Sequence, residues 1–189
     1  MNVRRVRFPH GAGRFSFLEV NNCEGGDPVT GLPKIAVSAC LLGECCTYKA
    51  THNKIDCLEE LKHYASFVPV CPETQGGLEA PRLPAEIQPH KEGESVKVLL
   101  KDGTDVTYEF VRGAEEARDN AVSEGCEYAL LKERSPSCGF GSIYDGSFTG
   151  VTIVGNGLGA DFIHKAGIPI YGESRVDELI QKLKNDSMA

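Results

Sequence analysis

From residue 34 onward, the chain alternates short apolar runs rich in β-branched residues with stretches of helical periodicity. This alternation is typical of βαβ units, in which helices cover both faces of a parallel sheet. We therefore predict an α/β fold: a single doubly wound, Rossmann-like, mostly parallel sheet with helices on both faces. A small β-hairpin excursion is expected to interrupt the alternation.

Each predicted element follows from a local pattern. The expected strands are the apolar runs at residues 35–37, 67–70, 128–131, 151–154 and 168–171. The expected helices show amphipathic spacing, and they cover residues 53–64, 110–124, 158–165 and 173–183. Residues 95–100 and 105–108 flank an Asp102-Gly103 pair, a strong turn signal that predicts the hairpin.

The first 33 residues differ from the rest. Four arginines precede the first acid, Glu19, and a stretch bearing Gly, Asn and Pro follows; the arginines are Arg4, Arg5, Arg7 and Arg14. We predict a flexible N-terminal extension over residues 1–33 and the α/β domain over residues 34–189. An arginine-rich, acid-poor beginning also occurs in organelle-targeting segments, so targeting stays open as an alternative.

Composition narrows the classes of partner. The 189 residues suffice for one domain, and no apolar run approaches the length of a membrane span. A formal net charge of -7 disfavours a broad basic face for nucleic-acid phosphates, so a small molecule is the expected partner. Eight cysteines without a signal-peptide pattern favour a reducing, cytoplasmic compartment, where clustered cysteines serve as metal ligands or redox groups.

Three of the cysteines share one topological position. Cys40 and Cys71 follow the first two predicted strands, and Cys138 lies in the loop after the third. The carboxyl ends of parallel strands lie along one edge of a sheet, so these thiols are expected to converge there. Clustered thiolates select zinc, copper(I) or iron–sulfur clusters. Structural zinc usually takes four ligands in Cys-x-x-Cys pairs, whereas single cysteines at loop ends suit a cluster better.

Several ordered motifs now become recognisable. They are Ser-Ala-Cys-Leu-Leu-Gly at 38–43, Cys-Pro-Glu at 71–73 with Gly-Gly-Leu at 76–78, Pro81-Arg82, Pro84 and Glu86, Leu131-Lys132, Ser-Pro-Ser-Cys-Gly at 135–139, and Tyr-Asp-Gly at 144–146 with Phe148. In these motifs the chain closely resembles the DUF523 family, which is the 2-thiouracil desulfurase family. The resemblance covers roughly residues 34–175 and leaves out the N-terminal segment.

The resemblance implies a [4Fe-4S] cluster held by three cysteines, which map here to Cys40, Cys71 and Cys138. One iron would then lack a protein ligand, and an open position on a metal allows a substrate to bind and be polarised. The implied activity is a non-redox desulfurase reaction. It hydrolyses the carbon–sulfur bond of a 2-thiouracil-like pyrimidine and yields the oxo-pyrimidine and hydrosulfide.

The motifs also supply candidate catalytic and substrate-binding residues. Glu73, two residues from a cysteine ligand, is the candidate base that activates water, with capping of a turn as the alternative. Ser135 and Ser137 are the other catalytic candidates, although Ser and Pro are also ordinary turn residues. The substrate-binding candidates are Lys132, Arg82 and Ser38. A loop-anchoring ion pair for Lys132 and a structural role for Arg82 are the alternatives.

Cys45 and Cys46 could supply a fourth ligand or a labile redox pair. The family commonly continues with Cys-Arg-Tyr-Asp-Gly, whereas Cys46 is followed here by Thr47, Tyr48, Lys49 and Ala50. Because the departure removes an arginine and an acid near the expected pocket, we expect it to bear on which substrate the site accepts and on its activity. We interpret the remaining cysteines as incidental; they are Cys23, Cys57 and Cys126.

Two rival functions stay open. Residues 155–160 fit the G-x-G-x-x-A dinucleotide pattern and precede Glu173, which allows a dinucleotide-binding oxidoreductase, or simply a tight packing turn. The second rival is a non-enzymatic zinc- or thiol-based binding module.

Overall fold

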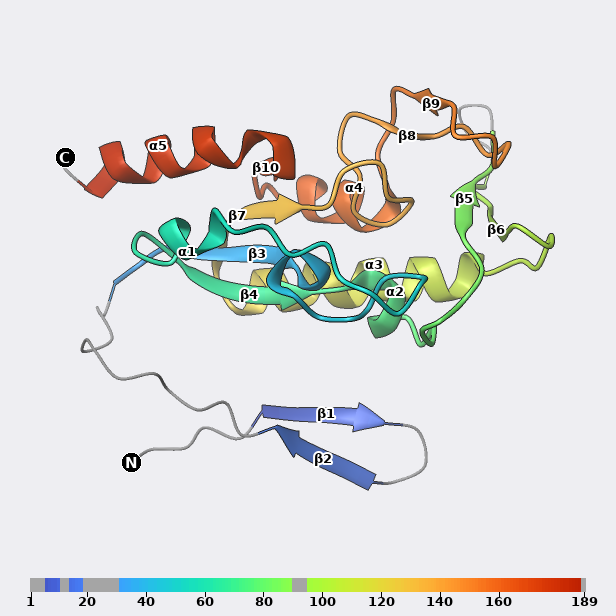
Figure 1. Ribbon diagram of the computed structural model, residues 1–189, viewed down its shortest axis with the longest axis horizontal. Coiled ribbons are helices and arrows are strands. Elements are labelled where there is room, and N and C mark those ends of the chain that lie inside the picture. The colour runs from blue at the N-terminus through green and yellow to red at the C-terminus, as the bar shows by residue number, and fades with distance from the viewer. Residues whose placement is uncertain (1–5, 11–13, 19–30, 90–94, 188–189) are drawn as a thin grey trace. The chain divides into compact units, whose positions relative to one another are not determined.

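The computed structural model describes residues 6–10, 14–18, 31–89 and 95–187 (Figure 1). The chain divides into two units, Met1–Gly31 and Leu32–Ala189. In the first unit, the strands β1 (Val6–His10) and β2 (Arg14–Leu18) pair antiparallel. The sequence did not predict this ladder, and the rest of the expected extension falls mostly outside the described residues.

The second unit is a mixed α/β fold, as predicted. Within the described residues its central sheet has four strands in the order β10-β7-β3-β4, and every neighbouring pair is parallel. The strands are β3 (Lys34–Ser38), β4 (Ser66–Val70), β7 (Cys126–Leu131) and β10 (Ile170–Gly172). Pro69 is tolerated in β4 because β4 is an edge strand, where a missing ladder donor costs little.

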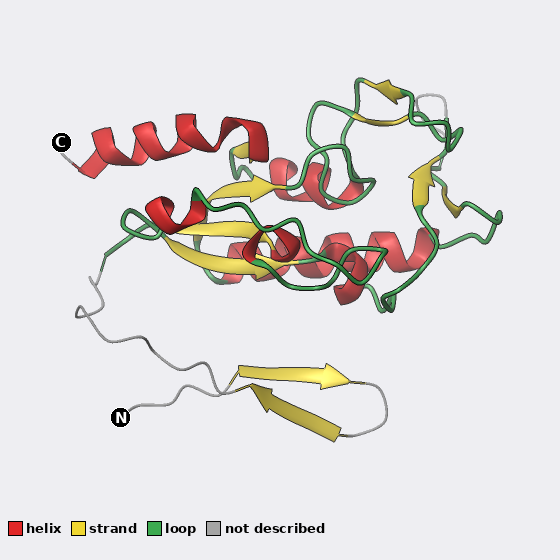
Figure 2. Cartoon of the chain, viewed as in Figure 1, coloured by secondary structure: helices red, strands yellow, loops and turns green. Residues whose placement is uncertain are grey.

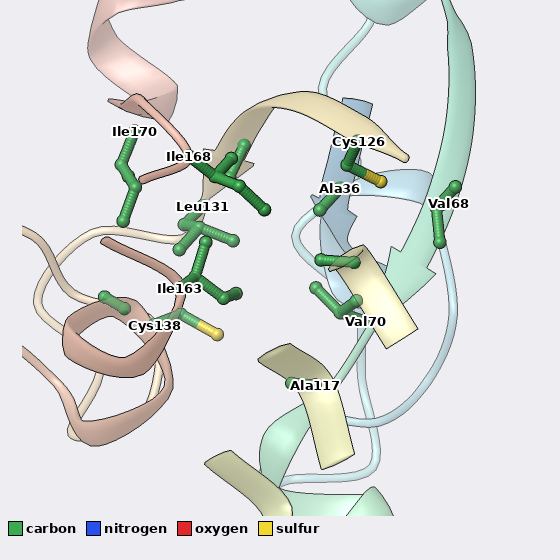
Figure 3. Packing of buried hydrophobic residues seen from close by; sticks show 13 residues of the cluster. Ala36, Val68, Val70, Ala117, Cys126, Leu131, Cys138, Ile163, Ile168 and Ile170 are labelled. Carbon is green, nitrogen blue, oxygen red and sulfur yellow. The ribbon is translucent and has the colours of Figure 1, made fainter. Parts of the chain in front are cut away.

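Helices pack on both faces of this sheet (Figure 2). Ala36 of β3 belongs to a buried cluster with α3 (Thr107–Ser123) and α4 (Leu158–Lys165), which Figure 3 shows. Its neighbours Ile35 and Val37 belong to a second cluster with α1 (Leu58–Leu61) and α5 (Val176–Ser187). Successive strand residues point to opposite faces, so this alternation places a helical layer on each side.

The longest described helix, α3, runs from Thr107 to Ser123, and Gly125 stops it with a φ of 70°. Its buried residues include Phe110, Ala114, Ala117 and Ala121, the apolar face that the sequence predicted. Among the described residues, no helix is both long enough and apolar enough to cross a lipid bilayer.

The loops that follow β3, β4 and β7 lie at the same edge of the sheet because the strands are parallel. The first begins with η1 (Ala39–Leu42), the second with Cys71 and then α2 (Pro72–Gln75), and the third with residue 132. The chain leaves β3 toward β4 on one side and returns to β7 on the other. Strand order therefore reverses between β3 and β7, where ligands bind in sheets of this type.

The predicted helix over residues 53–64 is wrong for its first half, since only Leu58–Leu61 forms α1. The amide of Asn53 donates to the carbonyl of Cys40, and the amide of Ile55 donates to that of Leu41. These bonds hold the segment extended along η1, so helical periodicity in the sequence was overridden by tertiary contacts.

The predicted strand over residues 151–154 is also shorter and lies elsewhere. Only β9 (Thr152–Ile153) forms, and it pairs antiparallel with β8 (Ile143–Tyr144) outside the central sheet. Both residues of β9 are exposed, so this apolar run does not contribute to the central core.

The predicted hairpin has its turn but not its second strand. The amide of Leu100 donates to the carbonyl of Thr104 at 2.9 Å, as a turn at Asp102-Gly103 requires. However, Asp105 accepts the Thr107 amide through its side chain and starts α3 there, which leaves a single bridge between Leu99 and Asp105. β6 (Val98–Leu100) pairs instead with the earlier strand β5 (Ala85–Ile87).

Two glycines allow the backbones of α2 and α3 to pack in direct contact. A Cβ atom on Gly113 would lie 1.7 Å from the carbonyl oxygen of Pro72, and one on Gly76 would lie 2.0 Å from that of Glu109. Neither backbone can move without displacing a helix. This close approach fixes α2, which directly follows Cys71 and carries Glu73.

We expect Gly113→Ala to lower the free energy of unfolding by about 3 kcal/mol because overpacking against backbone forces the two helices apart. An ordinary Gly→Ala change in a helix stabilises the protein by about 1 kcal/mol. A loss of stability in Gly113→Ala would therefore indicate the close contact with α2. Denaturant unfolding measures the change, and Glu115→Ala on an exposed position of α3 is the matched control. Equal or greater stability in Gly113→Ala would refute the close contact.

Candidate metal centre and active site

Cys40, Cys71 and Cys138 line one cavity of about 540 Å³. Cys40 lies in η1 directly after β3, Cys71 precedes α2 directly after β4, and Cys138 lies in the loop after β7. Cys40 and Cys138 are buried, and Cys71 is half-buried. The three thiols therefore border the same cavity where the parallel strands end, as their positions in the sequence predicted.

A fourth thiol belongs to the same group. Cys46 is hydrogen-bonded through its side chain to both Cys40 and Cys71. This contact lowers the pKa of Cys71 to about 7 and also lowers the pKa of Cys40. The pKa of Cys46 itself is raised, first because its hydrogen bonds to Cys40 and Cys71 favour the protonated thiol and then because it is partly buried. Two of the three predicted ligands are thereby biased toward the thiolate, the form that binds metal.

Cys138 is held differently. Burial raises the pKa of its thiol, and the Ser38 hydroxyl is hydrogen-bonded to it. The same hydroxyl accepts the backbone amide of Lys132 at 3.0 Å, and Ser38 is only 2% exposed. Ser38, predicted to bind substrate, is therefore used within the protein to connect β3 with the loop that carries Cys138.

The donor set fits an iron–sulfur cluster in its chemistry. Its thiols are soft ligands, which select iron–sulfur clusters, zinc or copper(I) over hard cations. Among the described residues, no three Cys, His, Asp or Glu side chains come close enough together to bind one metal ion. A cluster is larger than an ion and needs donors placed around a cavity, which is how these cysteines lie.

Beside the cysteines, Glu73 forms a network with the two predicted catalytic serines. Its Oε1 accepts the hydroxyl of Ser137 at 2.6 Å, and the Ser135 and Ser137 hydroxyls lie 3.1 Å apart. The Ser135 hydroxyl also accepts the amides of Ser137 and Cys138. The predicted turn role of Ser135 is thus present, while Ser137 faces the carboxylate.

Arg82 lies behind Glu73 rather than free in the cavity. Its Nε donates to Oε2 of Glu73 at 2.9 Å, and its Nη2 also contacts that oxygen. The remaining donors reach the carbonyls of Cys46 and Glu79 at 3.2 and 3.1 Å. Because every terminal nitrogen has a protein acceptor, the structure favours the structural alternative for Arg82 over the predicted substrate contact.

Lys132 forms the anchoring ion pair that the sequence left as an alternative. Its Nζ binds the carboxylate of Glu173, whose second oxygen accepts the amide of Glu133 at 2.5 Å. Glu133 in turn accepts the amide of Ser174. Lys132 still lines the cavity, but this network ties the loop after β7 to the start of the last helical segment.

The glycine-rich residues 155–160 hold the Cys138 loop. The amides of Leu158 and Ala160 donate to the carbonyls of Pro136 and Ser137 at 2.9 and 3.0 Å. A Cβ on Gly157 would lie 2.6 Å from the carbonyl carbon of Ser137. The amides that would bind a dinucleotide phosphate are used internally, which favours the tight packing turn over the oxidoreductase alternative.

The segment that departs from the family motif forms a turn at the cavity wall. Thr47 and Thr51 share a hydroxyl contact of 2.9 Å, and Ala50 adopts a φ of 54°. That conformation strains a residue with a Cβ and suits glycine, which the family motif carries there. Lys49 lies with its Nζ 5.4 Å from the centre of the Tyr48 ring.

The other cysteines lie apart from the cavity or outside the described residues. Cys126 is buried in the core, where burial raises its pKa to about 11. Figure 3 shows it beside Ala36, with Cys138 beside Ile163. Cys57 packs against the opposite core cluster, Cys45 is exposed, and Cys23 lies outside the described residues.

Fold and site together define an α/β protein whose cavity is lined by cysteines from three strand ends. A family model described as 2-thiouracil desulfurase matches residues 35–175. The chain belongs to this family.

Two known proteins are similar to this chain over most of its length. The uncharacterized protein YbbK of Bacillus subtilis (strain 168) is 36% identical over 151 residues, which cover 77% of this chain and 99% of YbbK. A solved structure described as the [4Fe-4S]-dependent thiouracil desulfidase TudS is 42% identical, with a TM-score of 0.70. That similarity covers 80% of this chain and 98% of TudS.

Proposed function

We propose that this chain is an iron–sulfur-dependent desulfurase that converts a thiolated pyrimidine to the oxo-pyrimidine and releases hydrosulfide. One observation carries the proposal: three strand-end thiols surround a single cavity beside the Glu73–Ser137 pair. Membership of the family and the 42% identity to a [4Fe-4S]-dependent thiouracil desulfidase support it.

Cys40, Cys71 and Cys138 would hold the [4Fe-4S] cluster, and their soft thiolate chemistry fits it. When bound, the cluster supplies an iron without a protein ligand, a Lewis acid for a thiocarbonyl sulfur. Cys46 favours the thiolate forms of Cys40 and Cys71 and is not counted among the ligands. Ser38 orients Cys138 through its hydroxyl.

Side chains of the protein carry out the proton transfers of the hydrolysis. Hydrolysis adds one water, forms a carbon–oxygen bond and breaks the carbon–sulfur bond, which yields hydrosulfide and a proton without electron transfer. We assign Glu73 as the general base, acting through Ser137: the serine accepts a proton from water while passing its own to Oε1. Arg82 orients Glu73 from the opposite oxygen, and Ser135 orients Ser137.

The remaining assignments belong to the same proposal. Strand order reverses at the cavity and helices lie on both faces, which supports a doubly wound, Rossmann-like classification. Residues 34–189 would form the catalytic domain, with residues 1–33 as an extension. A cytoplasmic location and a small-molecule rather than nucleic-acid substrate follow from the cysteine content and the net charge of -7.

Anaerobic reconstitution with iron and sulfide, followed by incubation with 2-thiouracil, its nucleoside and its nucleotide, tests the function. We expect hydrosulfide and the matching oxo-pyrimidine in equal amounts, with no reductant added. Fully loaded protein that releases no sulfide from any of these compounds would refute the proposed function. A strict requirement for an electron donor would refute its non-redox character.

A further inference from the structure

Glu86 is a buried carboxylate that the mechanism above does not use. It lies at the centre of β5, is only 7% exposed and lines the 540 Å³ cavity that the cysteines share. Its Oε2 accepts the backbone amide of Phe148 at 3.0 Å. The sequence placed Glu86 in a family motif without giving it a role.

The second oxygen, Oε1, has no hydrogen-bond donor or basic partner among the described residues. Among the described residues, every side-chain nitrogen or oxygen that is fully buried has a hydrogen-bond partner. Because Oε1 has no such partner, it is not fully buried and reaches accessible space. Glu86 is among the residues that line the cavity, and we take the cavity to be the space that Oε1 faces. A buried carboxylate with one backbone donor is costly unless a further donor arrives.

Two aromatic residues border the same cavity from the turn that Glu86 anchors. Tyr144 and Phe148 both line it, and Phe148 adopts a φ of 58°, which is unusual for a bulky residue. Strained conformations of this kind persist where the surrounding structure enforces them, and they cluster at binding sites. Aromatic faces beside a single acceptor suit a flat heterocycle that carries an N–H group.

We propose that Glu86 recognises the pyrimidine ring by accepting its N3–H through Oε1. N3 lies between C2 and C4, so this N–H is adjacent to the thiocarbonyl whether sulfur is at C2 or at C4. The contact also leaves N1 free, which any ribose would occupy. This role rests on the proposed function, since it specifies which group of the pyrimidine substrate the same cavity would recognise.

Binding of uracil, the expected product from 2-thiouracil, and of its methylated forms tests the contact without turnover. Equilibrium dialysis of the reconstituted protein compares the affinities for uracil, 1-methyluracil and 3-methyluracil. We expect 1-methyluracil to bind within a few-fold of uracil and 3-methyluracil to bind at least about 100-fold more weakly, because it leaves a buried acceptor unpaired. Equal binding of the two methylated rings would overturn the proposal even if sulfide release is observed.

Glu86→Gln separates recognition from packing. Glutamate accepts at both oxygens, whereas glutamine accepts at one, so the variant cannot hold both the Phe148 amide and the ring N–H. We expect uracil binding to weaken by about 10-fold to 100-fold, with the preference against 3-methyluracil reduced. Glu115→Gln, on an exposed position of α3, is the charge-matched control and should bind like the unmodified protein.

Thermal unfolding and iron content accompany each binding measurement. Reduced stability of Glu86→Gln with unchanged uracil affinity would mean that Glu86 only caps the Tyr144–Phe148 turn, and would overturn the proposal. Absence of sulfide release with the expected methyl preference would instead reject the desulfurase function and keep the recognition role.

Discussion

Cys40→Ala, Cys71→Ala and Cys138→Ala are each expected to lower iron and acid-labile sulfide content by at least about tenfold. Even a residue that supports a metal ligand typically contributes about 10-fold to 100-fold to metal affinity, so loss of a direct thiolate should cost more. The measurement is iron and sulfide per chain after anaerobic reconstitution, together with the visible absorption of the protein.

Two other cysteines provide matched controls for these variants. Cys126→Ala removes a buried cysteine from the same core and should keep full iron content. Cys46→Ala removes the thiol that contacts Cys40 and Cys71, and it should retain most of the iron if three cysteines hold the cluster. Loss at Cys46 equal to that at Cys40 would establish a fourth ligand and remove the open iron position.

Glu73→Gln is expected to slow sulfide release by about 100-fold to 10,000-fold because glutamine cannot take up the proton of water. Cluster content should stay unchanged, since Glu73 is not among the proposed ligands. The amide can still accept the Ser137 hydroxyl, so the geometry of that contact is kept. The rate of sulfide release at saturating 2-thiouracil measures the effect.

The charge of Arg82 requires a second variant. Its side chain is only 9% exposed, so Glu73→Gln leaves a nearly buried guanidinium unpaired and can cost about 3 kcal/mol or more of stability. The double variant Glu73→Gln with Arg82→Gln removes both charges, and it should regain stability without regaining activity. Recovery of activity in the double variant, or full turnover in Glu73→Gln, would rule out Glu73 as the base.

The sequence predicted well where one physical rule dominates. Short apolar runs became the strands β3, β4, β7 and β10, because a parallel sheet covered by helices favours apolar side chains along its strands. The convergence of Cys40, Cys71 and Cys138 followed from parallel topology alone. The residues 158–165 were correct as a helix, with α4 at the predicted bounds.

Prediction failed where contacts distant in sequence decide the outcome. Helical spacing at residues 53–57 was overridden by bonds from Asn53 and Ile55 to η1. No local pattern indicated the ion-pair partners of Arg82 and Lys132, which are Glu73 and Glu173 and lie 9 and 41 residues away along the chain. The substrate contacts of Arg82 and Lys132 stay predictions. The role of Glu86 depends on an amide 62 residues away, for which a local pattern gives no signal.

Metal analysis of protein purified anaerobically tests the proposed cluster most directly. If Cys40, Cys71 and Cys138 hold a [4Fe-4S] cluster, we expect a brown protein with broad visible absorption and about four iron atoms and four acid-labile sulfides per chain. A colourless protein that binds zinc at full occupancy and takes up no iron on reconstitution would contradict it.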